Sequence, residues 1–211
     1  MTTDTAASSA LVPDEVTDLL FRSARTVNTF AEGEVTDEQI RAVWDVVRWG
    51  PTAMNSLPLR LLLVRTPAGR ERLVSHMADG NKAKTERAPL SIVVAADVNF
   101  HENMPRLAPH MPGVRDNLHP NEAARTAMAR DNAFLQLGYF ILGLRAEGLQ
   151  VGPMTGFDAA GVDTEFFAGT AWRALAVLNV GHAPEDVEDF GMPASWPRQT
   201  RLDFEDVAQA V

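Results

Sequence analysis

The sequence contains no cysteine. This absence excludes disulfide bonds, metal sites built on thiolates and catalysis by a cysteine nucleophile. A chain without disulfides suits a reducing compartment, so we expect a cytoplasmic protein.

Positive charge is scarce as well. Lysine and arginine number 19 against 28 acidic residues, which gives a net charge of −9 and disfavours binding to a phosphate backbone, so no nucleic-acid partner is expected. No apolar run approaches the roughly 20 residues that cross a bilayer, so no membrane partner is expected either. Residues 1–10 lack the basic start and apolar core of a signal peptide, and we predict a flexible tail there.

Several motifs are also missing. The sequence has no G-x-G-x-x-G, G-x-x-x-x-G-K-[ST] or G-x-S-x-G, which argues against a Rossmann dinucleotide site, an NTPase and an α/β-hydrolase. His101, His110 and His119 are too widely spaced in the sequence to indicate a metal triad, and no metal site is predicted.

What is present indicates one folded domain. The chain has 211 residues, of which 45% are hydrophobic, and we predict a single domain over residues 11–211. Thr36 and Gln39 form a capping box that begins a helix, and Gly50 with Pro51 ends it. Apolar runs predict buried strands at 61–64 and 91–97. Further helices are predicted at 13–24 and 67–77, a small helix around 166–167, and strands at 149–154 and 174–180.

Three further segments differ from the short helices and strands above in length or composition. Residues 98–120 are rich in proline and lack any period, which predicts a long loop or flap. Residues 121–147 predict the longest helix, apolar on nearly every side and therefore buried in the fold or in a dimer interface. From residue 182 onward we predict an extended C-terminal arm that ends in a short helix at 204–210. Together these elements predict an α+β fold.

Four polar clusters carry the candidate chemistry. The segment 49–58 offers backbone amides, a hydroxyl and a carboxamide with almost no charge, which suits a flat aromatic ligand. The other clusters are residues 25–28, 81–84 and 198–201. Arginine forks and hydroxyls suit a phosphate, and a cation near a flavin ring stabilises its reduced form. The set predicts a flavin mononucleotide (FMN) site, although any one cluster alone would more simply face solvent.

The order and spacing of these clusters resemble the FMN-dependent nitroreductase family, and within it the branch of malonic semialdehyde reductases from pyrimidine degradation. The resemblance implies a central mixed β-sheet flanked by helices in a domain-entwined homodimer. The matching segments are residues 24–28, 49–52, 80–85, 88–89, 148–158, 166–169, 179–181 and 201–205.

The resemblance also implies the cofactor-binding residues. At the phosphate and ribityl end these would be Arg25, Thr26, Asn28, Arg198 and Arg201. Near the isoalloxazine ring they would be Asn81, Lys84, Thr155 and Gly156, with the last two over N5. From the neighbouring subunit they would be Pro51, Thr52, Ala53 and Asn55.

The implied activity needs no catalytic side chain, because hydride passes from NADPH or NADH through flavin N5 to a small acceptor in a ping-pong scheme. Malonic semialdehyde would give 3-hydroxypropanoate, and Arg106 and Arg115 are candidates for binding its carboxylate. Asn28, Leu57 and Thr155 replace a basic residue, a Gln and a Glu of many relatives, which argues against broad nitroaromatic activity. The alternatives are a general nitroreductase or quinone reductase, and a flavin-binding protein without turnover.

Overall fold

A computed structural model describes residues 12–184 and 198–211. The tail predicted at 1–10 and part of the C-terminal arm lie outside these residues. Within them, no helix is both long and apolar enough to cross a membrane. The elements are α1 (Asp14–Thr17), η1 (Asp18–Arg22), α2 (Asp37–Val47), η2 (Ala53–Asn55), β1 (Leu59–Val64), α3 (Pro67–His76), α4 (Asp79–Arg87), β2 (Leu90–Asp97), η3 (Phe100–Asn103), α5 (Met104–Leu107), α6 (Val114–Leu118), α7 (Glu122–Ala146), β3 (Gln150–Met154), α8 (Ala159–Phe166), β4 (Trp172–Gly181) and α9 (Phe204–Val207).

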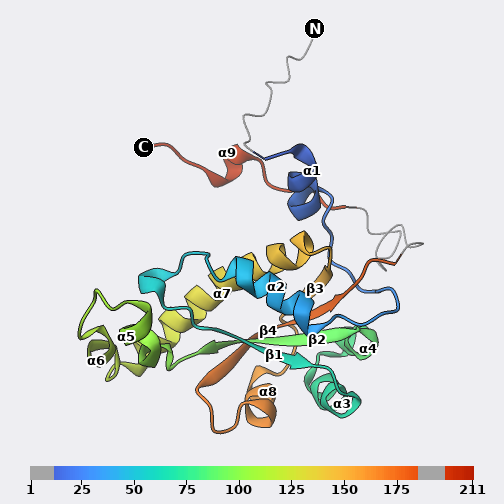
Figure 1. The fold of residues 1–211 in the computed structure, drawn as a ribbon. Coiled ribbons are helices and arrows are strands. Elements are labelled where there is room, and N and C mark those ends of the chain that lie inside the picture. Colours follow the sequence, from blue (N-terminus) through green and yellow to red (C-terminus); the bar gives the residue numbers. More distant parts are fainter. Residues whose placement is uncertain (1–11, 185–197) are drawn as a thin grey trace.

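The predicted α+β class is confirmed, with a four-stranded sheet of order β1-β2-β4-β3 between layers of helices (Figure 1). One detail differs, because all the strand pairings in the described residues are antiparallel, whereas a mixed sheet was expected. Continuous apolar strands show only that both faces of the sheet are covered, and they do not fix strand direction.

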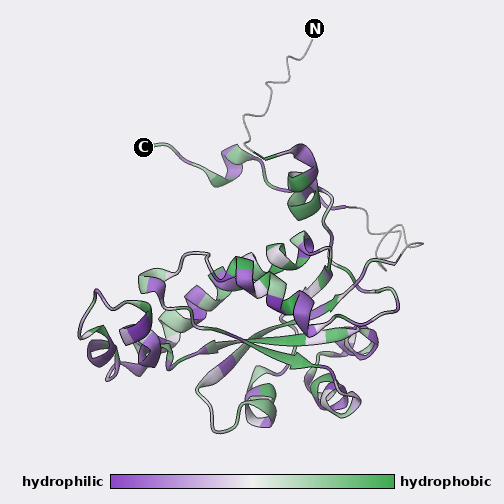
Figure 2. Cartoon of the chain, viewed as in Figure 1, coloured by the Kyte–Doolittle hydropathy of each residue, from purple (hydrophilic) through white to green (hydrophobic). Residues whose placement is uncertain are grey.

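The central strand β2 shows how both faces are covered. All eight of its residues are buried. Ile92 and Val94 belong to the core cluster that includes Phe140 of α7, while Val93 belongs to a second cluster with Leu73 of α3. Because successive side chains of a strand point to opposite faces, α2 and α7 cover one face and α3 and α8 the other (Figure 2).

The long helix α7 confirms the prediction at 121–147, with Asn121 accepting a hydrogen bond from the Ala124 amide as its cap. Its buried residues include the polar side chains of Asn132 and Gln136. Leu135, in contrast, is 45% exposed. The helix therefore packs on the sheet through one side and leaves apolar surface on another.

The prediction of a loop at 98–120 was wrong in detail, because the segment folds into η3, α5 and α6. Arg125 of α7 is buried, and its guanidinium donates hydrogen bonds to the carbonyls of Val98, Leu118 and His119. These bonds join the two ends of the segment at one side chain. Four-to-five-residue helices carry too few periodic positions for a sequence pattern to reveal them.

Helix α1 with η1 and the C-terminal helix α9 lie near each other and away from the sheet (Figure 1), and Arg198 donates a hydrogen bond to the carbonyl of Phe21. The predicted helix at 13–24 is present as α1 followed by the π-helix η1, and the C-terminal helix is limited to α9. Leu202 and Phe204 are 73% and 75% exposed, so this arm presents apolar side chains that the described residues do not cover.

Candidate functional site

The segment that holds Arg25, Thr26 and Asn28 runs along the edge strand β3. The amide of Val27 donates to the carbonyl of Val151 at 3.3 Å. A Cβ atom on Gly152 would collide with the carbonyl oxygen of Val27, so only glycine permits this approach. The predicted phosphate-end residues are thereby fixed at one edge of the sheet.

Helix α4 and the turn after β3 meet beside this edge. The Asn81 side-chain amide donates to the carbonyl of Gly156 at 2.8 Å, and the Ala78 amide donates to the same oxygen at 3.0 Å. Lys84 lies three residues after Asn81 and therefore on the same side of the helix. We call Arg25, Thr26, Asn28, Asn81, Lys84, Thr155 and Gly156 the sheet-edge cluster.

Buried polar side chains hold α4 against the sheet. Asn179 of β4 donates to the Thr85 hydroxyl at 3.3 Å and accepts from the Ser91 hydroxyl at 2.9 Å. All three residues are buried, and Asn179 is paired in register with Gly152. Sequence reasoning gave these side chains no positioning role. A lone Asn inside an apolar strand was the signal available.

The sheet-edge cluster carries two cations that the fold does not neutralise. Arg25 and Lys84 are half-buried, and neither forms an ion pair or hydrogen bond with any residue that the structure describes. Lys82, two positions away, is paired with Asp79 at 2.7 Å. Partly buried cations without protein partners are suited to an anionic ligand.

A second group, Pro51, Thr52, Ala53 and Asn55, lies in the loop before β1, and we call it the loop cluster. Asn132 of α7 accepts a hydrogen bond from the Ala53 amide at 2.7 Å. Asn55 donates to the carbonyl of Leu107 in α5 at 2.8 Å. Gln136 accepts from the Leu59 amide at 3.0 Å. Asn132 and Gln136 are four residues apart and therefore on the same side of α7, which is the only sign in the sequence that they act together.

The backbone of this loop is strained. Met54, Asn55 and Leu57 have φ angles of 54°, 55° and 42°, a region that residues other than glycine rarely adopt. Such conformations cost on the order of 1–3 kcal/mol each and concentrate at functional sites. The hydrogen bonds from α7 and α5 hold this loop in its shape.

The two clusters lie at opposite ends of the β1–β2 pair. The loop cluster directly precedes Leu59, the first residue of β1, whereas α4 ends just before β2, whose Ser91 pairs with Val64 at the other end of β1 (Figure 1). Six residues of strand separate the two ends by about 20 Å. One chain does not bring the clusters together.

Arg198 and Arg201 lie in the C-terminal segment. Arg198 donates to the carbonyl of Phe21 at 3.2 Å, and Arg201 donates to the carbonyls of Gln199 and Thr200 at 2.9 and 3.0 Å. Both arginines are exposed. Their contact with the cofactor stays a prediction.

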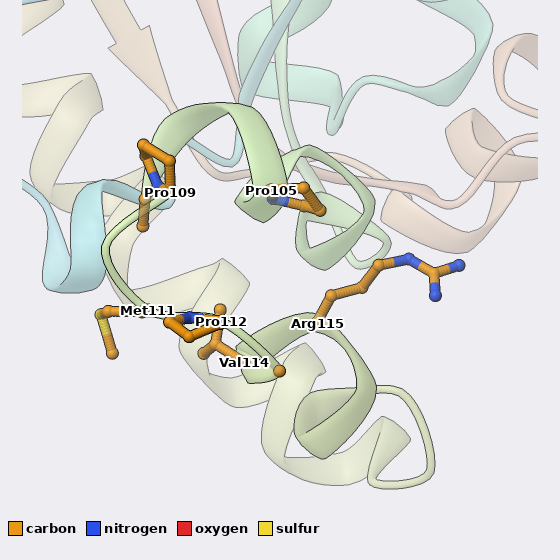
Figure 3. Close-up of a pocket in the computed structure, with 8 residues that line it drawn as sticks. Pro105, Pro109, Met111, Pro112, Val114 and Arg115 are labelled. Atoms are coloured by element: carbon orange, nitrogen blue, oxygen red, sulfur yellow. The ribbon is translucent and has the colours of Figure 1, made fainter.

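Arg106 lies on α5, whose Leu107 carbonyl accepts a hydrogen bond from Asn55 of the loop cluster, and Arg115 lies on α6. Arg115 borders a cavity of about 180 Å³ lined mainly by proline and aliphatic side chains, and Figure 3 shows its guanidinium pointing away from Met111 and Pro112. It donates to Glu102 at 2.7 Å and to Asp116 at 2.9 Å. Arg106 is exposed and has no ion pair among the described residues.

Two of the three histidines lie close together in space although they are far apart in the sequence. The fold of 98–121 brings His101 Nε2 to 3.1 Å from His119 Nδ1, with Glu102 beside both, whereas His110 is not in this group. Burial, followed by the charge of Arg125, lowers the pKa of His101. The hydrogen bond from Arg115 lowers the pKa of Glu102.

The sequence matches the nitroreductase family over residues 21–182. A Streptomyces griseus protein provisionally named NADH dehydrogenase/NAD(P)H nitroreductase is 50% identical over 92% of this chain and 95% of its own length. The fold is similar to that of a provisionally named nitroreductase from Bacillus subtilis, with a TM-score of 0.78 at 19% identity, covering 94% of this chain and 99% of the other. It is also similar to one from Exiguobacterium sibiricum solved in complex with FMN, with a TM-score of 0.76 at 19% identity, covering 93% and 97% of the two chains.

Proposed function

This chain belongs to the nitroreductase family, and we propose that it is an FMN-dependent NAD(P)H oxidoreductase that works as a homodimer. The observation that carries the proposal is the sheet-edge cluster, in which Arg25 and Lys84 remain unneutralised beside Gly152 and Gly156. When bound, FMN supplies a hydride carrier between NAD(P)H and an acceptor.

The donor set fits FMN. Arg25 and the Thr26 hydroxyl offer the charge-assisted and neutral hydrogen bonds that a phosphate accepts. The Gly156 carbonyl is already bonded by Asn81, which fixes the turn that presents the Thr155 and Gly156 amides. Lys84 lies on the same side of α4 as Asn81, and its positive charge would stabilise negative charge on a bound flavin ring when the ring is reduced.

The separation of the two clusters supports a site shared between two chains. A two-fold axis that places the loop cluster of one chain against the sheet-edge cluster of the other completes two equivalent sites at once. Exposed apolar side chains near the loop cluster, Val46 at 71% and Trp49 at 79%, supply surface for such an interface.

Malonic semialdehyde is the acceptor that we propose, on the strength of the matching segments in the sequence. Its carboxylate requires a cation, and Arg106 is better placed to supply one than Arg115, because Glu102 and Asp116 already engage the Arg115 guanidinium. Since Asn55 contacts the carbonyl of Leu107, Arg106 would reach the flavin of the other chain together with the loop cluster.

An anaerobic absorbance experiment tests this function. The FMN-loaded protein is reduced with NADPH or NADH, excess reductant is removed, and malonic semialdehyde is added. We expect the flavin bands to bleach and then return quickly, and the return to slow in Arg106→Ala but not in Arg173→Ala, which removes an exposed arginine of β4.

Return of the bands only with a quinone or a nitroaromatic compound would reject the semialdehyde and favour the general reductase. Bound FMN that neither nucleotide reduces would favour a flavin-binding protein without turnover. Steady-state rates that give intersecting double-reciprocal lines would contradict the ping-pong scheme.

A further inference from the structure

A compact group of nitrogen and oxygen ligands lies in the segment between β2 and α7, outside both clusters described above. His101 Nε2 is 3.1 Å from His119 Nδ1 and 3.3 Å from Glu102 Oε1, and His119 Nδ1 is 3.8 Å from the same oxygen. His101 is 1% exposed, whereas the His119 side chain is 64% exposed. One side of the group is therefore enclosed by the fold and the other is open to solvent.

These separations match those between the ligands of a tetrahedral metal ion. At metal–ligand distances of about 2.0–2.2 Å, two ligands of a tetrahedral ion stand roughly 3.3–3.6 Å apart. A point equidistant from the three atoms lies about 2 Å from each of them, within the range of zinc–nitrogen and zinc–oxygen bonds.

The surroundings supply part of what a metal site needs. The two carboxylate oxygens of Glu102 have different neighbours. Oε2 accepts a hydrogen bond from Arg115 at 2.7 Å, whereas Oε1 faces the histidines. Hydrogen bonds of this kind orient ligating carboxylates.

We propose that His101, Glu102 and His119 form a binding site for a divalent transition-metal ion, with Zn²⁺ as its first candidate. Two imidazoles and one carboxylate suit Zn²⁺ better than Mg²⁺ or Ca²⁺, which prefer oxygen ligands. Water completes the coordination on the side where His119 is exposed. The ion joins the start of the segment to its end, a second link beside that of Arg125.

A competing explanation is a hydrogen bond between two neutral imidazoles that only packs the segment. That arrangement requires no carboxylate and binds no ion. Zinc binding that depends on Glu102 as well as on His119 separates the two explanations.

The test is calorimetric titration of Zn²⁺ into untagged, FMN-loaded protein that has been treated with chelator. We expect one ion per chain in the wild type. His119→Ala and Glu102→Gln, both at partly exposed side chains, should weaken binding by at least about 100-fold, the upper end of the loss caused by removing an outer-shell partner. His110→Ala, an exposed histidine of the same segment, is the matched control and should bind as the wild type does.

Thermal unfolding gives a second readout that does not depend on flavin chemistry. Zn²⁺ should raise the melting temperature of the wild type and of His110→Ala, and leave that of His119→Ala unchanged, because a ligand stabilises only the folded state that binds it. Absence of saturable Zn²⁺ binding at micromolar concentrations, or equal affinity in His119→Ala and wild type, would overturn the proposal.

Discussion

At the scale of single residues, neighbouring lysines of α4 differ in what they contact. Lys82 is paired with Asp79, whereas Lys84 has no partner among the described residues. Lys84→Ala should weaken FMN binding by about 10- to 100-fold, since hydrogen bonds to charged groups contribute about 1.5–3 kcal/mol. Lys82→Ala removes the same charge and should change the affinity little. Quenching of flavin fluorescence measures both, and equal losses would show that only the overall charge matters.

Gly152 is the residue that lets the Arg25 segment approach β3. In Gly152→Ala the new methyl group meets the Val27 carbonyl, and we expect unfolding free energy to fall by about 1–3 kcal/mol, with weaker FMN binding as the segment moves. Gly80→Ala is the control, because nothing lies within 4 Å of a Cβ at that position in α4. Urea unfolding of both variants measures the difference, and equal stability would contradict the close approach.

At the scale of elements, α7 supports the loop cluster as well as the core. Asn132→Ala removes the acceptor of the Ala53 amide, and the loss of this partly buried hydrogen bond costs about 0.5–1.5 kcal/mol. We expect faster hydrogen exchange in residues 51–57 and weaker FMN binding, while the sheet remains protected. Thr126→Ala, on the exposed surface of the same helix, should change neither. Unchanged exchange in Asn132→Ala would mean that the loop keeps its shape without α7.

Many of the helices and strands were predictable from the sequence. The capping box of Thr36 and Gln39 is present, and the apolar runs at 61–64 and 91–97 are β1 and β2. Strand direction was not predictable, because helices on both faces produce the same apolar runs in parallel and antiparallel sheets. The proximity of His101 to His119 depends on Arg125, a buried charge that resembles a surface residue in the sequence.

The candidate site was predictable only in part, because its contacts join elements that are far apart in the sequence. Periodicity places Asn81 and Gly156 on separate elements, and their contact arises from packing between α4 and the end of β3. The family resemblance supplied the candidate residues as a prediction, and the structure adds the hydrogen bond between the Asn81 side chain and the Gly156 carbonyl. Asn132, Gln136 and Asn179 support the site through hydrogen bonds of their side-chain amides. These roles could be recognised only from the positions of the amide groups in space, which no sequence pattern reveals.

At the scale of the whole molecule, the apolar surface that one chain leaves uncovered predicts a dimer. Sedimentation equilibrium should give twice the chain mass of 23.0 kDa. Trp49→Lys places a charge at a 79% exposed tryptophan and should weaken dimerisation by more than about tenfold, as loss of an interface tryptophan commonly does. Glu38→Lys, which introduces the same side chain at an exposed position in the first turn of α2, should leave the dimer intact. A wild type that sediments as a monomer would contradict the shared site.

The most direct test of the shared site is complementation between two damaged chains. One chain carries Arg25→Ala with Lys84→Ala, and the other carries Ala53→Trp, a bulky side chain at an exposed position of the loop cluster. Each variant alone should form dimers that bind no FMN at micromolar concentrations.

The two chains are co-expressed with different tags, and the mixed dimer is purified through both. If each site combines the sheet-edge cluster of one chain with the loop cluster of the other, one site of the mixed dimer is intact and the other is doubly damaged. We therefore predict one FMN per mixed dimer, bleached by NAD(P)H. A mixed dimer that binds no flavin would contradict the account, because it would place both clusters of each site on a single chain.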